Sequence, residues 1–280
     1  MRNCVTYQNG YAASKAEAEY QDLWEGLVGA WSPSLGNTGD KLWDLSGRGN
    51  TGTLTSMDPA TDWVTSGGYG ALDLDGSDDY LQCAKTISLT TSLSVYTWLY
   101  PTNVTGNRVI VSQTDFAVGD AFVLFVNRSG TEVLTFRVGN TTPTSSSATG
   151  PTPTANALVL ICGTWDGTTV RLFTNNALEH TPASLSGSLY TSASVTLRVG
   201  EYGAGASHSS NYSGGLHEVG IFNRAISASE ISQLYTLGPG GLFTPRRRRI
   251  VAPAAAAATG ASRLVNGGLL NHPVFGGLVS

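Results

Sequence analysis

Oxygen-bearing side chains gather at three places in the sequence and form the group of residues best suited to hold a cation. DLSGRGN at 44–50 carries an aspartate and an asparagine, DGSDDY at 75–80 carries three aspartates, and HEV at 217–219 carries a glutamate. Calcium prefers such hard oxygen ligands, whereas the same side chains also satisfy backbone groups in tight turns. Both interpretations, a calcium site or turn hydrogen bonds, stay open for Asp44, Asn50, Asp75, Asp78, Asp79 and Glu218.

The sequence predicts no catalytic residues. A retaining glycosidase needs two carboxyl groups about 5 Å apart, but Glu218 has no second acid in its own strand-like stretch. The zinc motif H-E-x-x-H and the serine-nucleophile motif G-x-S-x-G are both absent from the sequence. We therefore expect a protein that is not an enzyme. The glycoside hydrolase alternative would need Glu218 to meet Asp75 or Asp79 in three dimensions.

Aromatic and amide side chains in loops are the candidates for sugar recognition. Saccharides are bound by aromatic faces together with a few planar polar groups. Tyr69 is one such loop aromatic, although aromatic residues in these positions also serve simply to pack the core. The remaining candidates for ligand binding are Trp43, Trp63, Tyr202, Asn211 and Tyr212.

The residues around Glu218 predict a strand. Residues 216–222 alternate between two faces, with His217, Val219 and Ile221 on one of them. This period of two is typical of a strand in a packed sheet. We expect the strand to be central rather than at an edge.

A short helix is predicted directly after this strand. Ser227 and Glu230 have the spacing of a capping box, and Ile226 and Ile231 have that of a hydrophobic staple. The Gly-Pro pair at 238–239 suits a C-terminal stop. The expected apolar face consists of Ile231, Leu234 and Tyr235. We expect this helix to close one end of a sandwich.

Several motifs carry a resemblance to a known family. They are GLHEVGIFNRAIS at 215–227, EISQLY at 230–235, DLSGRGNTG at 44–52, DGSDDY at 75–80 and DGTTVRLF at 166–173. These motifs resemble those of laminin-G-like domains in the concanavalin A-like lectin and glucanase superfamily. The resemblance implies an all-β jellyroll sandwich with one short C-terminal helix over residues 26–242. DGSDDY would then be a turn that joins two antiparallel strands.

Further strand-like runs recur at spacings near ten residues, separated by Gly, Asn and Asp. Asp166 and Gly167 predict the turn of a hairpin. The first strand is expected at Leu27–Trp31. The Thr- and Ser-rich stretch 141–154 is expected to be an exposed loop.

The two ends of the chain differ in composition from the sandwich and are expected to be extended arms. In the N-terminal arm, 1–25, Ser14 could cap a helix over 15–24, and the alternatives are a docking arm and a frayed terminus. The C-terminal arm, 243–280, combines four arginines, an Ala-rich linker and a Gly-punctuated apolar tail. Docking to a partner is expected from Arg246, Arg247, Arg248, Arg249, Leu269, Leu270 and Phe275. A solvated linker is the alternative for the arginines.

Charge and hydropathy limit the partners. A formal charge of −4 argues against a nucleic-acid or membrane partner for the whole chain, and four arginines neutralise too few phosphates for specific nucleic-acid recognition. No apolar run is long enough to span a bilayer. The N-terminal residues lack the apolar stretch of a signal peptide. We therefore expect the newly made protein to stay in the cytoplasm.

These features lead to one expected function and one alternative. GAWSPSLGNTGD and GPGGLFTPRRRR resemble stretches in laminin-G-like domains of tailed-phage virion proteins. The resemblance implies a non-enzymatic virion component, such as a capsid decoration, head-fibre or tail-adhesin subunit, assembled in the host cytoplasm. Its expected partners are other virion subunits, further copies of itself and a host glycan. The alternative is a carbohydrate-binding lectin on a bacterial cell surface.

Overall fold

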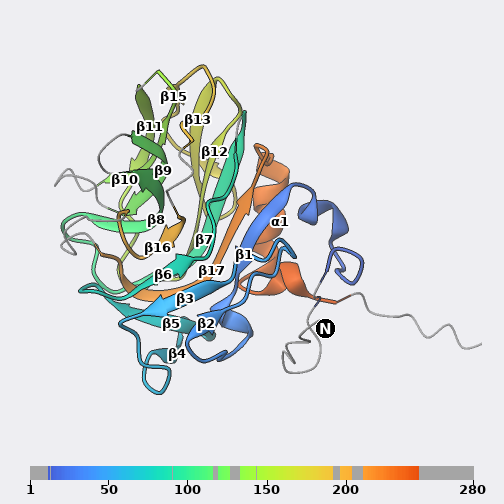
Figure 1. Ribbon diagram of the computed structural model, residues 1–280, viewed down its shortest axis with the longest axis vertical. Helices are drawn as coiled ribbons and strands as arrows, with labels where there is room; N and C mark the ends of the chain where they lie inside the picture. The colour runs from blue at the N-terminus through green and yellow to red at the C-terminus, as the bar shows by residue number, and fades with distance from the viewer. Residues whose placement is uncertain are drawn as a thin grey trace, which may run out of the picture. The chain divides into compact units, whose positions relative to one another are not determined.

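Two antiparallel β-sheets face each other and form a sandwich, with a single α-helix, α1 (Ala228–Leu237), among the described residues (Figure 1). The computed structural model describes residue 12 and residues 14–89, 91–115, 119–126, 133–142, 144–191, 196–203 and 211–245. The predicted all-β jellyroll class is confirmed. No helix within these residues is long and apolar enough to cross a membrane.

The first sheet, called sheet I, has the predicted strand around Glu218 near its centre. Its order is β14 (Leu178–Glu179), β13 (Thr169–Thr174), β12 (Val159–Trp165), β7 (Leu93–Pro101), β17 (Ser213–Phe222), β5 (Tyr69–Asp75) and β4 (Trp63–Ser66). In addition, β1 (Leu27–Trp31) pairs with β17, and β15 (Ala183–Ser184) pairs with β13. The predicted first strand and the hairpin at Asp166 and Gly167 are both confirmed.

The second sheet, called sheet II, covers the inner face of sheet I. Its order is β11 (Ser145–Pro151), β10 (Val133–Gly139), β9 (Gly119–Val126), β8 (Arg108–Asp115), β16 (Arg198–Val199), β6 (Tyr80–Cys83), β3 (Gly52–Thr55) and β2 (Lys41–Leu42). The stretch 141–154 is therefore not a loop, because β11 pairs along its length with β10. The sequence obscured this strand, since its Ser and Thr residues lie at the sheet edge and lack an apolar alternation.

Strand β12 shows how the chain builds two apolar layers. Val159, Ile161 and Trp165 point into the main core between the sheets, whereas Leu160 and Cys162 belong to a second cluster. Every residue of β12 is buried. A strand buried on both faces gives a nearly continuous apolar run instead of an alternation, as ALVLICGTW does.

Strand β17 is central, as predicted. It pairs with β7 along one side, while β5 and β1 pair with successive parts of its other side. The predicted alternation is broken at one point, because the pairing with β7 shifts register between Leu216 and Glu218. This bulge places Leu216 in the main core together with Val219 and Ile221, although strict alternation puts it on the opposite face.

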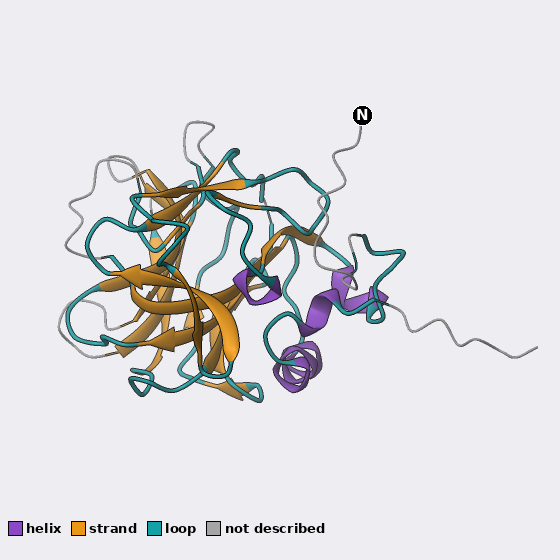
Figure 2. Ribbon diagram, turned by 90° about the horizontal axis from the view of Figure 1, so that it is seen from below, coloured by secondary structure: helices purple, strands orange, loops and turns teal. Residues whose placement is uncertain are grey.

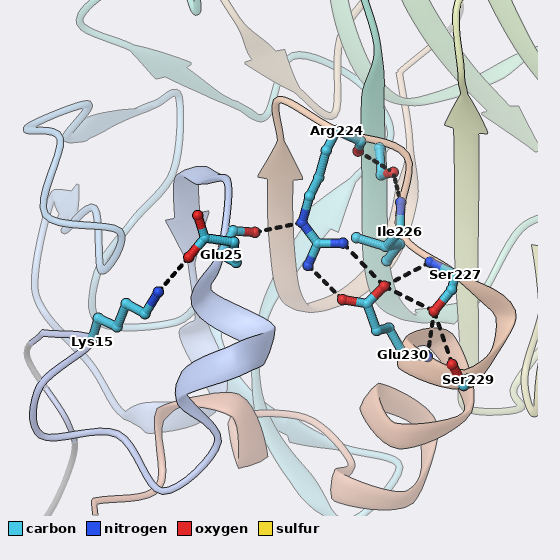
Figure 3. Close-up of polar contacts among 8 residues, drawn as sticks. Lys15, Glu25, Arg224, Ile226, Ser227, Ser229 and Glu230 are labelled. Atoms are coloured by element: carbon cyan, nitrogen blue, oxygen red, sulfur yellow. Dashed lines mark hydrogen bonds and ion pairs between the residues drawn. The ribbon is translucent and has the colours of Figure 1, made fainter.

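The start of α1 is fixed by polar contacts that the sequence predicted. Ser227 Oγ accepts a hydrogen bond from Glu230 N at 3.3 Å, and Ser227 N donates to the Glu230 carboxylate at 2.8 Å (Figure 3). Arg224 holds the same carboxylate with two nitrogens and donates to Glu25 O at 2.7 Å. Burial alone would raise the pKa of Glu230, but the hydrogen bonds from Arg224 and Ser227 hold it below its ordinary value.

Helix α1 does not close an end of the sandwich as predicted. It lies on the outer face of sheet I, and Figure 2 shows the longest helix beside the strands rather than between the sheets. Ile231 and Leu234 are buried there, confirming two of three predicted contact residues, while Tyr235 is 39% exposed. The physical reason is that sheet I is apolar on both faces, so its outer face needs a cover. Tyr96, Trp98, Leu160, Cys162 and Phe173 form that outer apolar face.

The described parts of both predicted arms are packed against this layer. Residues 15–17 form a turn and Gln21–Trp24 form a 3-10 helix, so the predicted helix over 15–24 is wrong. A second 3-10 helix, Gly241–Phe243, meets this segment, with Ala12 N donating to Phe243 O at 2.7 Å and the Trp24 ring 5.7 Å from the Phe243 ring. A further 3-10 helix, Pro33–Leu35, follows β1. Residues 1–11 and 246–280 lie outside the described residues.

The DGSDDY turn crosses from one sheet to the other. It follows β5 in sheet I and precedes β6 in sheet II, and these strands do not pair with each other. The turn joins two strands, as predicted, but they lie in different sheets and are not the predicted antiparallel pair. Turn chemistry fixes the local bend and leaves open which sheet receives the next strand.

Candidate functional site

A groove of about 500 Å³ opens where the end of α1 meets the outer face of sheet I. We call it the aromatic groove. It is lined by Tyr69, Trp98, Leu158, Asn176, Tyr235, Thr236, Leu237, Gly238 and Pro239. These residues come from β5, β7, the segment before β12, the turn after β13 and the C-terminal end of α1. Five separate parts of the chain thus converge on one surface.

Two exposed tyrosines give the groove its character. Tyr69 is 40% exposed and Tyr235 is 39% exposed, and they are two of the three large apolar side chains that are exposed in the described part of the chain. The Tyr235 ring stacks on the Trp98 ring, with centroids 5.7 Å apart and planes inclined by 17°. Trp98 is itself only 4% exposed, so it fixes Tyr235 from behind and leaves the other face of Tyr235 accessible.

Tyr69 is supported from below by a buried histidine. The His217 ring lies edge-on to Tyr69, with centroids 6.2 Å apart. Its Nδ1 is 2.8 Å from Gly70 O and its Nε2 is 3.3 Å from Ser66 Oγ, so both ring nitrogens have a partner. Burial lowers the pKa of His217. The histidine thus supports Tyr69 as a neutral imidazole whose two ring nitrogens are both engaged in hydrogen bonds.

The lining of the groove is aromatic and uncharged. It contains no carboxylate, imidazole, thiol or ammonium group. Stacked and edge-on aromatic rings with a few amide and hydroxyl groups are the usual lining of a small-molecule site.

Glu218, the acid of the hydrolase alternative, lies beneath the segment that follows α1. It is 1% exposed, and its carboxylate accepts hydrogen bonds from Tyr96 Oη at 2.5 Å, from Ser32 Oγ at 3.3 Å and from Gly240 N. Burial raises the pKa of Glu218 to about 7, although these hydrogen bonds oppose the shift. A carboxylate saturated in this way ties the exit of α1 to β17 and is shielded from a substrate.

Three of the six predicted cation ligands come together. Asp75, Asp78 and Asp79 each place a carboxylate oxygen within 4.8 Å of the others. Asp79 Oδ2 accepts from Asp75 N at 3.0 Å, and Asp75 Oδ1 accepts from Ser77 N at 2.7 Å. Burial, reinforced by the neighbouring carboxylates, raises the pKa of Asp79 to about 6. These three residues fit a cation by donor type, and calcium binding by them stays a prediction.

The other predicted cation ligands serve elsewhere. Asp44 accepts from the backbone N–H groups of Ala30, Ser46 and Asn50 at 2.8–3.0 Å. The Asn50 amide donates to Val28 O at 2.9 Å. Asp44 and Asn50 belong to one hydrogen-bond network and Glu218 belongs to another. Both networks are separate from the three aspartates at 75–79. This fits the interpretation that these side chains make structural hydrogen bonds.

Two of the predicted sugar-binding residues are not free to meet a ligand. Asn211 is completely buried and donates to Ser77 O at 3.0 Å, and Tyr212 is 1% exposed within the main core. That expectation therefore fails for both. Tyr202 is half-buried against Phe125, and its hydroxyl is held by Arg137 and Asp120.

The two predicted tryptophans differ in their surroundings. Trp63 is half-buried, packs against the main core and donates to Gly39 O at 3.1 Å. Trp43 is half-buried, and its sugar contact stays a prediction. The predicted docking residues Arg246 to Arg249, Leu269, Leu270 and Phe275 lie outside the described residues.

Sequence reasoning missed Trp98 and Tyr235 as site residues. Trp98 fitted a strand alternation, and Tyr235 fitted the apolar face of a helix. The available signal was the Gly-Pro stop at 238–239, three residues beyond Tyr235, because a side chain in the last turn of a helix often lies at the rim of the surface that the helix covers.

Comparison with known proteins identifies the fold. Residues 75–232, more than half of the chain, match the model of a family described as the concanavalin A-like lectin/glucanases superfamily. Among curated proteins, no match was found. Among solved structures, domain 4 of AbnA, a GH43 extracellular arabinanase from Geobacillus stearothermophilus solved with arabinotriose, is similar at 16% identity and a TM-score of 0.55. The similarity covers 78% of this chain and 98% of that one.

Two toxin domains are also similar in structure. The binding domain of paraclostridial mosquitocidal protein 1 has 15% identity and a TM-score of 0.58, covering 76% of this chain and 52% of that one. The receptor-binding domain of botulinum neurotoxin type G has 14% identity and a TM-score of 0.57, covering 76% and 51%. This chain thus matches about half the length of each toxin domain. At these identities the likeness concerns the fold alone.

Proposed function

Because this chain belongs to the concanavalin A-like lectin/glucanases superfamily, we propose that it is a non-enzymatic carbohydrate-binding protein whose ligand sits in the aromatic groove. The observation that carries the proposal is the pair of exposed tyrosines, Tyr69 and Tyr235, in one groove. The arabinotriose complex of the arabinanase domain lends support, since that domain is similar in fold and was solved with a sugar.

The groove is suited to a sugar for a physical reason. The C–H faces of a pyranose or furanose ring pack against an aromatic ring, while its hydroxyl groups need polar partners at the edge. Tyr235 is held flat by Trp98, so little side-chain freedom is lost when a ligand packs on it. Asn176, which also lines the groove, offers an amide that can both donate and accept.

A glycan array probed with the full chain tests this proposal. We expect binding to one or more glycans, and we expect Tyr235→Ala to weaken it about two- to tenfold, since an aromatic contact contributes roughly 0.5–1.5 kcal/mol. Leu178→Ala is the matched control, because Leu178 is 62% exposed and does not line the groove. Binding by the Tyr235 variant at wild-type strength, or no glycan binding by the wild type, would refute the proposal.

We further propose that the protein is a virion component that is anchored through its two arms. The support comes from the arms and from where they begin. Glu19 N donates to Thr244 O at 2.9 Å and Ala18 bridges to Pro245, so the described parts of the two arms lie side by side. Arms that start together can hold one partner from one side of the domain.

Deletion of residues 246–280 tests the anchoring role. The cut follows Pro245 because Phe243 is completely buried and must be kept for folding. We expect the full chain, but not the shortened one, to appear in a cryo-EM map of the purified particle. Equal incorporation of both chains would contradict the anchor. Detection of the chain on intact bacterial cells, without any particle, would instead favour the alternative of a cell-surface lectin.

A further inference from the structure

We propose that the aromatic groove selects neutral, hydroxyl-rich saccharides and excludes acidic ones. This inference rests on the proposed function and adds the chemical class of the ligand. Three features of the groove carry it: the absence of charge in its lining, the free carbonyl groups at the end of α1 and the direction of the helix dipole.

The lining residues carry no formal charge. They are aromatic, aliphatic, amide, hydroxyl, glycine and proline residues. A sialic or uronic acid needs a guanidinium, an ammonium or several N–H groups to replace the water around its carboxylate. Without them, a carboxylate that leaves water for this groove pays a desolvation penalty with no compensation.

The end of α1 presents acceptors to the groove. The carbonyls of Thr236 and Leu237 would normally accept from the N–H groups of Gly240 and Gly241, four residues further on. Gly240 N instead donates to the Glu218 carboxylate, and Gly241 N donates to Gly238 O at 3.1 Å. These two helix carbonyls are therefore left without their usual donors.

A tighter turn does not satisfy them either. Three residues after Thr236 comes Pro239, which has no N–H to donate. Three residues after Leu237 comes Gly240, whose N–H is already committed to Glu218. Both Thr236 and Leu237 line the groove, so a ligand hydroxyl can supply the missing donor.

The helix dipole acts in the same direction. The C-terminal end of a helix carries a partial negative charge, which attracts donors and repels anions. In α1 this end lies among the lining residues, and the buried Glu218 stands directly behind Gly240. The two unpaired carbonyls and the helix dipole together favour the hydroxyl groups of a neutral sugar and oppose a carboxylate.

Paired glycans test the inference. We suggest measuring dissociation constants of the full chain for lactose and 3′-sialyllactose, for galactotriose and trigalacturonate, and for every array hit and its acidic form. We expect each neutral glycan that binds to bind at least about tenfold tighter than its acidic partner. Thr236→Lys places a cation at an exposed position of the groove. In this variant, the dissociation constant of the acidic glycan divided by that of the neutral glycan should fall several-fold.

The outcomes separate this inference from the proposed function. Acidic partners that bind as tightly as neutral ones, and lose that binding in Tyr235→Ala, would overturn the selectivity while leaving the groove as the binding site. A wild-type chain that binds no glycan would overturn the proposed function and the inference together.

Discussion

Replacing Glu218 by Gln tests the electrostatics beneath the groove. In the folded state the pKa of Glu218 is raised from 4.5 to about 7, chiefly by burial. The folded protein therefore binds more protons than the unfolded chain between these two pH values, and stability falls as the pH rises through this window. A pKa difference of this size corresponds to roughly 3 kcal/mol. Glutamine stays neutral, so the Gln variant should lack this loss.

Urea denaturation of both proteins at pH 5 and at pH 8.5 measures the effect. The variant is expected to be destabilised at pH 5, because its amide cannot accept from all of Tyr96, Ser32 and Gly240 as the carboxyl oxygens do. On going to pH 8.5, its free energy of unfolding should gain roughly 2–3 kcal/mol relative to wild type. Glu19→Gln, at an exposed position, is the control and should show no such relative gain.

The result that would refute this reasoning is the same pH dependence in wild type and in the Glu218 variant. It would mean that Glu218 is hydrated in solution and that the hydrogen bond to Gly240 does not hold the exit of α1. The same variant addresses the hydrolase alternative: loss of a measured glycan hydrolysis in Glu218→Gln would restore Glu218 as a catalytic acid.

Three further predictions concern single sites. Ser227→Ala removes the cap of α1 and should lower the free energy of unfolding in urea by about 1 kcal/mol, whereas the exposed Gln233→Ala should leave it nearly unchanged. Gly220→Ala would place a Cβ 2.0 Å from the Tyr96 ring, so we expect a loss of about 1–3 kcal/mol by thermal denaturation; an unchanged melting temperature would mean that the ring moves freely. Asp79→Asn should raise the melting temperature at pH 8, because the pKa of Asp79 is raised to about 6 and its ionised form is disfavoured. If calcium binds this turn, millimolar calcium should stabilise the wild type and not the variant, while no effect on either would favour the turn interpretation.

Local chemistry explains what could be read from the sequence. The capping box of α1 was predictable because its two partners are three residues apart and satisfy each other's backbone groups. The hairpin at Asp166 and Gly167 was predictable for the same kind of reason, since Asp166 accepts from the backbone N–H groups of Thr168 and Thr169 within the turn. Such contacts involve only neighbours along the chain.

The errors arose where a local pattern has more than one tertiary solution. DGSDDY makes the same turn whether the next strand stays in the sheet or crosses to the other one. An apolar face on α1 does not say whether it covers an end or a face of the sandwich. The bulge at His217 changes which side Leu216 occupies, and a bulge is decided by the pairing partner β7, far away in the sequence.

The sequence by itself determined the all-β class, the central strand around Glu218 and the capped helix, because each follows from periodicity or from contacts between near neighbours. Only the tertiary structure decided that Tyr69, Trp98 and Tyr235 share one groove and that Glu218 takes the N–H of Gly240 from the end of α1. These residues lie on segments far apart in the chain. Their meeting depends on which face of sheet I the helix covers, and packing of the whole sandwich makes that choice.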